Sequence, residues 1–341
     1  MKAPAVHKTW RAALALGAVA LLAAACGGGG GGGTEPPTGG GGGGGGPTLS
    51  GVLWHGNYAL DLVDGTQLAY LSGALPRVLN GDSAATPAPD GTRYGISDYD
   101  NRNDETRLSI KRTSDGAVQF TRLYEGYLSS PQPSPAVASQ LLVQYQDTPA
   151  APRFYGVVDL ASGNVIEVYP DDTVAVAWLS DGRVVVLARS GAVGVGLPGA
   201  TRTATGQVDL LGRTVVGLAA QPGGTRLLLS LRAITASGDV EGSDLWLSQL
   251  DGSNPVRFTR TNISGGGHWS PDGTRIAFTI DTGTVCSGGS CSGTCEQWHA
   301  PATASDLNPQ PASPGVAGRF SVKDRQGRSQ TLGCGLSGWT P

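Results

Sequence analysis

The residue types best suited to covalent or metal chemistry are cysteines near the C-terminus. They are Cys286, Cys291, Cys295 and Cys334. An even number of thiols in an exported protein typically forms disulfides, and the sequence leaves their pairing open. The alternative is a metal site that includes His299, but zinc sites usually contain paired C-x-x-C elements, which this spacing lacks. The sequence therefore predicts two disulfides and no metal.

Histidines are the next candidates for chemistry, and beyond the first 25 residues they are His55, His268 and His299. His268 lies at the end of an expected channel-lining strand, where a base could serve a lyase. The chain has no G-x-S-x-G or H-E-x-x-H motif. In the acid-rich segment 97–106, Arg102 occupies a position where a calcium loop needs an oxygen ligand. We therefore expect segment 97–106 to be a loop between strands. For the chain as a whole we expect no catalytic residue and no cofactor.

The first 48 residues are expected to form an export signal and a linker. Residues 1–25 combine a positively charged start with an apolar stretch, 12–25, that ends in small residues. That stretch is shorter than the ~20 apolar residues that a membrane-spanning helix needs. Residues 26–48 are rich in glycine and cannot bury apolar surface, so we expect a disordered linker. The net charge of −3 and the absence of a basic cluster argue against a nucleic-acid partner.

The junction between signal and linker carries a second site for chemistry. The sequence LLAAAC, 21–26, resembles a bacterial lipobox, although Ala23 stands where that family usually has leucine. The resemblance implies that Cys26 carries a lipid anchor; the alternative is ordinary cleavage at an A-x-A sequence. Gly27, rather than aspartate, follows the cysteine. In lipoproteins this implies an outer-membrane location, on the periplasmic or the surface side.

These sites must be positioned by a domain built from strands. From residue 49 onward, short apolar runs alternate with turn residues, and no long helical period appears. One unit recurs, most clearly in HWSPDGTRIAFTID, 268–281, where proline and glycine suit a turn between two strands. Apart from the last, the spacings between successive copies lie within the ~40–50 residues of a four-stranded propeller blade. The aligned turn positions are Pro89, Pro135, Ser180, Pro222, Pro271 and Pro341.

A second hairpin follows each first one and completes a four-stranded blade. The expected copies are 57–71, 107–121, 154–169, a degenerate 191–205, 244–259 and 319–332. On this assignment Cys286, Cys291 and Cys295 fall in a loop, 281–297, of the overlong last blade. The tryptophans Trp178 and Trp269 share one repeat position and are expected to pack between blades.

Closure of the ring completes the predicted fold. Residues 51–55 supply the second strand of a blade, and residues 335–341 supply a lone first strand. Joined side by side, they close a ring without an open sheet edge. The sequence therefore predicts an all-β domain over 49–341, a six-bladed β-propeller of four-stranded antiparallel blades.

The SPDGTRIAF turn with its following LWLSQLDGS hairpin resembles the repeat of TolB-type β-propellers. The resemblance covers about residues 49–341. TolB proteins carry a separate α/β domain before the propeller, whereas a glycine-rich linker precedes it here, so the envelope partners of TolB are not carried over.

These observations favour a binding protein over an enzyme. We expect a monomeric, lipid-anchored propeller that contacts the membrane through its anchor and holds a protein, peptide or glycan ligand. One alternative is a propeller enzyme of the polysaccharide lyase or hydrolase kind with His268 as base. The other is a structural envelope lipoprotein without a discrete ligand.

Overall fold

The computed structural model describes residues 49–56, 58–63, 66, 68–71, 85–146, 154–238, 240–287 and 290–341. The predicted export signal, 1–25, and the predicted linker, 26–48, with its Cys26, lie outside the described residues. The regular secondary structure of the described part consists of β-strands. This part contains no helix with the length and apolar character needed to cross a membrane.

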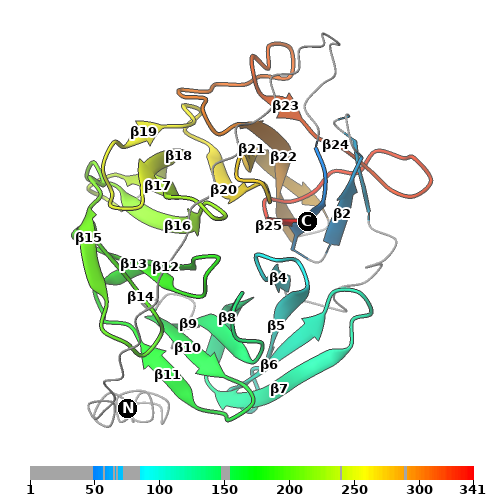
Figure 1. Ribbon diagram of the computed structural model, residues 1–341. Coiled ribbons are helices and arrows are strands. Elements are labelled where there is room, and N and C mark those ends of the chain that lie inside the picture. Colours follow the sequence, from blue (N-terminus) through cyan, green and yellow to red (C-terminus); the bar gives the residue numbers. More distant parts are fainter. Residues whose placement is uncertain are drawn as a thin grey trace, which may run out of the picture.

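The strands form six sheets arranged in a ring (Figure 1). Each of the first five sheets has four antiparallel strands, and we number these blades in chain order. Blade 1 contains β4 (Ala85–Pro87), β5 (Arg93–Asp100), β6 (Glu105–Arg112) and β7 (Val118–Glu125). Blade 2 contains β8 (Tyr127–Pro133), β9 (Gln140–Gln146), β10 (Phe154–Asp159) and β11 (Val165–Val168). Blade 3 contains β12 (Thr173–Trp178), β13 (Val184–Ala188), β14 (Ala192–Gly196) and β15 (Thr203–Gln207). Blade 4 contains β16 (Thr214–Ala220), β17 (Arg226–Ile234), β18 (Val240–Gln249) and β19 (Val256–Arg257). Blade 5 contains β20 (Ser264–Trp269), β21 (Arg275–Ser287), β22 (Ser290–Pro301) and β23 (Gly318–Arg319).

The sixth sheet, the closing blade, joins the two ends of the described chain. Its strand order is β25 (Leu336–Thr340), β1 (Val52–His55), β2 (Tyr58–Leu62), β3 (Leu68–Leu71) and β24 (Ser321–Lys323). β25 pairs antiparallel with β1, with Leu53 opposite Trp339. The indole Nε1 of Trp54 donates to Thr340 Oγ1 at 2.9 Å, and that of Trp339 donates to Ser50 O at 3.0 Å. The predicted all-β, six-bladed propeller and its closure are therefore confirmed.

Blade 5 differs from the expectation. The sequence predicts a loop over 281–297, but most of this segment belongs to the long hairpin of β21 and β22, which are paired as far as Ser287 and Ser290. The segment 319–332, expected as the second hairpin, instead contributes β24, which pairs in parallel with β3 of the closing blade. The cysteine-rich stretch is rich in serine and glycine, so it has no apolar alternation to mark a strand.

The turn between the first two strands is held by a side chain in several blades. In blade 5, Asp272 accepts hydrogen bonds from the backbone N–H of Thr274 at 3.0 Å and from its hydroxyl at 2.8 Å. Gly273 has a φ of 68°, a conformation that favours glycine. Asp90 and Thr92 of blade 1 repeat the same two hydrogen bonds. These local contacts explain why the turns can be recognised in sequence.

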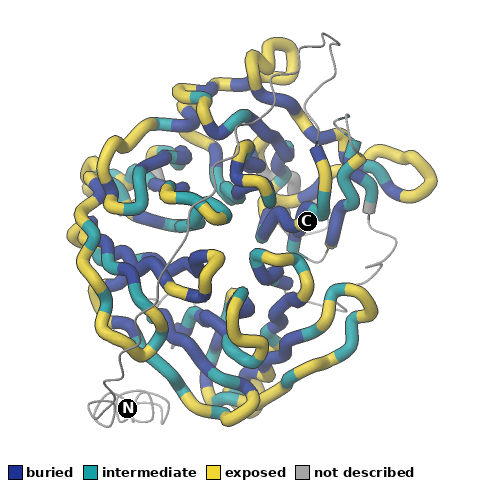
Figure 2. Tube along the Cα trace, in the orientation of Figure 1, coloured by how far each residue is buried: buried dark blue, intermediate teal, exposed yellow. Residues whose placement is uncertain are grey.

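The core lies between neighbouring blades, and the outer strands are more exposed (Figure 2). The two tryptophans at the shared repeat position confirm the expected packing. Trp178 of blade 3 donates through Nε1 to Gln132 O of blade 2 at 3.0 Å. Trp269 of blade 5 donates in the same way to Ala219 O of blade 4 at 3.2 Å. Each indole therefore buries its ring and satisfies its N–H on the blade before it.

Candidate functional site

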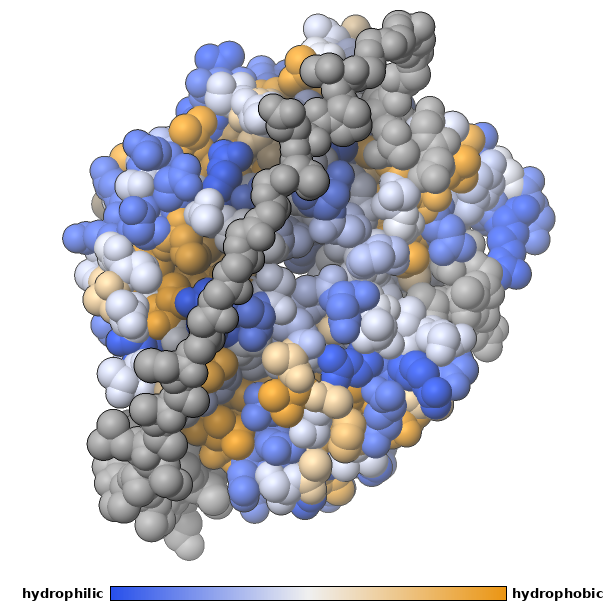
Figure 3. Space-filling view, viewed as in Figure 1, coloured by the Kyte–Doolittle hydropathy of each residue, from blue (hydrophilic) through white to orange (hydrophobic). Residues whose placement is uncertain are grey.

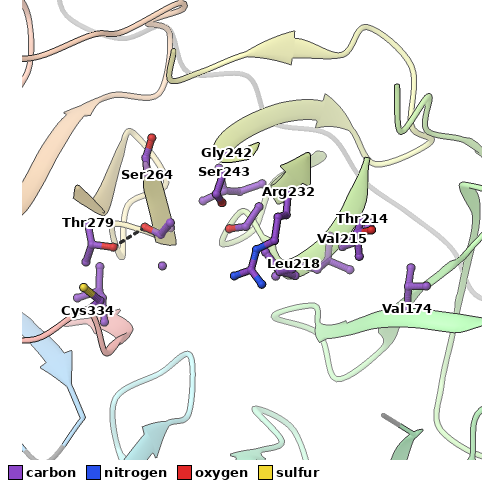
Figure 4. A pocket seen from close by; sticks show the side chains of 18 of the residues that line it. Val174, Thr214, Val215, Leu218, Arg232, Gly242, Ser243, Ser264, Thr279 and Cys334 are labelled. Atoms are coloured by element: carbon purple, nitrogen blue, oxygen red, sulfur yellow. Dashed lines mark hydrogen bonds between the residues drawn. The ribbon is translucent and has the colours of Figure 1, made fainter. Parts of the chain in front are cut away.

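A cavity of about 860 Å³ opens beside the axis, where blades 3, 4 and 5 meet (Figure 4). Its walls include the innermost strands β12, β16 and β20, parts of β17, β18, β21 and β22, and the start of β25 with the segment that leads into it. On the face in view, the surface around the centre of the ring is mostly hydrophilic (Figure 3). A cavity of this volume is within the range that holds small ligands.

Small residues on β20 create the space. Ser264 is followed by three glycines, Gly265 to Gly267, and the pairing with β21 shifts register between Gly265 and His268. A Cβ atom on Gly267 would lie 2.8 Å from the Leu228 side chain, so this glycine permits close packing of blades 4 and 5. A Cβ on Gly265 would meet nothing within 4 Å. The glycines therefore let the blades approach at one point and leave open space at the next.

His268 lines this cavity, as the sequence suggested. Its Nε2 lies 3.2 Å from the Leu336 carbonyl oxygen, which can only accept, so Nε2 carries the proton and Nδ1 remains an acceptor. Burial lowers the pKa of His268 to about 4. The ring is therefore neutral at pH 7, and its low basicity makes it a poor proton acceptor for catalysis.

The other two candidate histidines are core residues. His55 Nε2 lies 2.7 Å from Gly333 O, and burial lowers the pKa of His55. His299 Nδ1 accepts from Arg275 Nη2 at 2.7 Å, and its ring packs on Phe320 with 4.8 Å between centroids. Burial, with the nearby Arg275 charge, lowers the pKa of His299 to about 3. Neither residue lines the cavity.

These buried histidines predict a loss of stability in acid. Unfolded histidine takes up a proton below pH 6.5, whereas folded His299 stays neutral until about pH 3, so acidification between these values favours the unfolded state. At pH 5 the free energy of unfolding is lower by about 2 kcal/mol for one such histidine than it is at pH 7. We expect His299→Gln to reduce the drop in unfolding free energy between pH 7 and pH 5 by about this amount, measured by urea unfolding. An unchanged drop in the variant would contradict the assignment.

The structure contains a disulfide between Cys295 and Cys334, with Cα atoms 5.0 Å apart. Both residues line the cavity, and Asp281 lies beside them. Because the two sulfurs are bonded to each other, they offer no thiolate to a metal ion. The predicted second disulfide would join Cys286 and Cys291, whose Cα atoms are register partners in β21 and β22. It stays a prediction.

The acid-rich segment 97–106 spans the end of β5, a turn and the start of β6. Its side chains hold that turn together. Asp100 accepts from the backbone N–H of Arg102 at 2.9 Å, and the Tyr99 hydroxyl donates to Asp104 at 2.9 Å. The segment joins the second and third strands of blade 1, as expected.

Sequence reasoning missed Arg232, one of the two arginines that line the cavity. Arg232 on β17 extends into the space bordered by Thr279 and Leu218 (Figure 4). Its Nε atom is buried without a hydrogen-bond partner. Most residues of the strand RLLLSLRAI are apolar, which is typical of a buried strand, and the arginine near its end belongs to no distinguishing motif. Only the glycines of the neighbouring blade show that this side chain faces a cavity.

Comparison with known proteins assigns the chain to no family. No protein family matches the chain, and no curated protein is detectably similar to it. Similar solved structures include TolB from Acinetobacter baumannii, with 10% identity and a TM-score of 0.47 over 80% of this chain and 66% of that chain. Another is the GH74 enzyme of Niastella koreensis, with 12% identity and a TM-score of 0.48 over 81% of this chain and 45% of the enzyme. A third is the β-propeller domain of Cps50 (Swd1) from Myceliophteria thermophila, with 12% identity and a TM-score of 0.48 over 85% and 95% of the two chains. With TM-scores below 0.5, these likenesses carry no argument, and the strand pairings alone establish the fold as a six-bladed β-propeller.

Proposed function

We propose that this chain is a lipid-anchored binding protein of the bacterial cell envelope, which holds a peptide or glycan segment in the cavity beside the propeller axis. The observation that carries the proposal is the cavity itself, about 860 Å³ between the inner strands of three successive blades. Pockets of this size bury most of a small ligand, with a few polar groups fixing its orientation. Here the polar groups include Arg232 and His268, beside backbone exposed by Gly265.

Filling the cavity tests the binding site. Gly265→Phe is suitable because a Cβ there meets nothing within 4 Å and the φ of Gly265 is not positive, so we expect the fold to survive. Short peptides and envelope glycan fragments are screened for binding by the rise they cause in the melting temperature of the protein. A ligand at 100 times its dissociation constant stabilises by about 2.7 kcal/mol. We expect that rise in the unaltered protein and its loss in Gly265→Phe.

The matched control is Val118→Phe, on the exposed edge strand β7 of blade 1, where Val118 is 54% exposed. This variant adds a phenylalanine far from the cavity lining and should keep the ligand response. A ligand that stabilises Gly265→Phe as much as the unaltered protein would place binding elsewhere and contradict the proposed site.

The proposed anchor is tested separately at Cys26. We expect Cys26→Ser to move the protein from the membrane fraction to the soluble fraction, because acyl chains supply ~0.8 kcal/mol per buried methylene group. Fractionation followed by immunoblotting measures the change. A variant that remains with the membrane would refute the lipid anchor.

One observation favours a second candidate, a polysaccharide lyase or hydrolase. His268 and Arg232 line the same cavity, which brings a proton acceptor and a cation to one site. Against this, the lowered pKa of His268, about 4, weakens it as a base at pH 7. Activity on envelope or plant polysaccharides that disappears in His268→Ala would establish the enzyme in place of the binding protein.

A further inference from the structure

We propose that Arg232 is the anchor of the cavity for a carboxylate group on the ligand. The inference rests on the proposed function in one respect, because it names the chemistry of what the cavity holds.

The position of Arg232 follows from the alternation of β17. Leu227, Leu229 and Leu231 pack in the core shared with blade 3, while Leu228 packs in the core shared with blade 5. Successive side chains of a strand point to opposite faces, so Arg232 shares the face of Leu228. Near the axis, the glycines of β20 leave that face uncovered. Figure 4 shows the guanidinium extending from β17 into the open space.

Arg226 lies on the same face of β17 and makes the contacts that are typical of a structural arginine. Arg226 donates through Nη1 to Ala302 O at 2.9 Å and lies 5.9 Å from the centre of the Trp269 ring. The side chain of Arg232, by contrast, makes no hydrogen bond and no ion pair with any described residue, and its Nε is buried. Buried polar groups in native proteins are nearly always paired. Because the guanidinium of this unpaired side chain extends into the cavity, we expect its partner to be supplied from outside.

The chemistry of that partner follows from geometry and charge. A guanidinium presents N–H donors in a fixed planar fork, which matches the two oxygens of a carboxylate. The charged residues that line the cavity are two arginines and three acids, which gives a formal charge of −1: Arg189, Arg232, Asp171, Glu241 and Asp281. A multiply charged anion would meet repulsion from the acids. A single carboxylate on an otherwise neutral ligand pairs with Arg232 and adds the least repulsion. The C-terminus of a peptide and a uronic acid sugar share this group.

The test follows the Arg232 Nε–H signal in a proton–nitrogen correlation spectrum, assigned by its loss in Arg232→Met. We expect sodium acetate to shift this signal saturably and acetamide to leave it in place. The exposed Arg325 provides the control, because Arg325→Met should retain the acetate response. An Arg232 signal that acetate does not move, or moves without saturation, would overturn the proposal.

Matched pairs of probes then identify the source of the carboxylate. Methyl glucuronide is compared with methyl glucoside, and alanyl-alanine with alanyl-alaninamide. We expect the acid of one pair to bind at least about tenfold more tightly than its neutral partner, and Arg232→Met to remove this preference. A sugar preference assigns a uronate, and a peptide preference assigns a C-terminus. Equal binding of acid and neutral probes would overturn the proposal.

The two proposals can fail separately. If a neutral ligand binds, is blocked by Gly265→Phe and is unaffected by Arg232→Met, the binding function stands and the carboxylate anchor falls. If acetate binds at Arg232 while no peptide or glycan binds in the cavity, Arg232 is a carboxylate-binding residue and the proposed binding function is wrong.

Discussion

Removing residues 335–341 is expected to abolish cooperative folding of the propeller. These residues include β25, and without it β1 loses one of its two antiparallel partners and becomes an open edge of the closing blade. Leu336 and Trp339 leave the core of the closing blade, and the Trp54 indole loses its bond to Thr340. Truncation of a buried tryptophan alone typically costs about 3–5 kcal/mol. Together with the lost strand pairing, this approaches the whole stability of a typical domain, about 5–15 kcal/mol.

Near-ultraviolet circular dichroism and urea unfolding measure the effect. The shortened chain still contains Cys334, so its disulfide with Cys295 can form and the comparison isolates the strand. A synthetic peptide of residues 335–341, added in trans, should restore part of the native signal. A shortened chain that unfolds cooperatively at an unchanged urea midpoint would show that closure contributes little.

Replacing Asp244 should have the next largest effect, because one fully buried carboxylate holds the segment that leads into β20. Its Oδ1 accepts from the backbone N–H groups of Thr261 at 2.9 Å and Asn262 at 3.0 Å. Its Oδ2 accepts from Arg257 Nη2 at 2.6 Å. Removing one partner of a buried ion pair typically costs about 3–5 kcal/mol. We expect Asp244→Asn to lose about this much stability in urea.

The same change should weaken ligand binding, since Asn262, Ile263 and Ser264 line the cavity. The matched control is Asp251→Asn, an exposed aspartate in the turn after β18, which should change stability by less than about 0.5 kcal/mol. If Asp244→Asn proved no more harmful than the control, the carboxylate would not be holding the segment.

The sequence predicted the blades because their information is local. A turn such as the one at Asp272 is stabilised by its own neighbours, so it can be recognised without knowing the rest of the fold. Closure was predictable for a related reason, because the incomplete blades at the two ends, 51–55 and 335–341, complement one another. The β21–β22 hairpin was missed because it is held by backbone pairing and its cysteine-rich end carries no apolar pattern.

The candidate site was predicted only in part. His268 was found because it stands beside a repeat landmark, Trp269. Arg232 was not, because its role depends on a gap in a different blade, created by Gly265 to Gly267. An arginine beside a full-sized neighbour would be an ordinary interblade contact, as Arg226 is. The two arginines differ in the shape of the protein surface that faces each of them. The local sequence around an arginine carries no information about that shape.

The pairing of β1 on both of its edges has a mechanical consequence. β1 lies between β2 and β25, and the described chain reaches it from Leu49. A pull on the chain at residue 49 therefore loads two ladders of hydrogen bonds together, instead of peeling one free strand from an edge. Resistance to such a pull is governed by the rate of unfolding rather than by equilibrium stability. A tether attached at this point could carry drag without unravelling the ring.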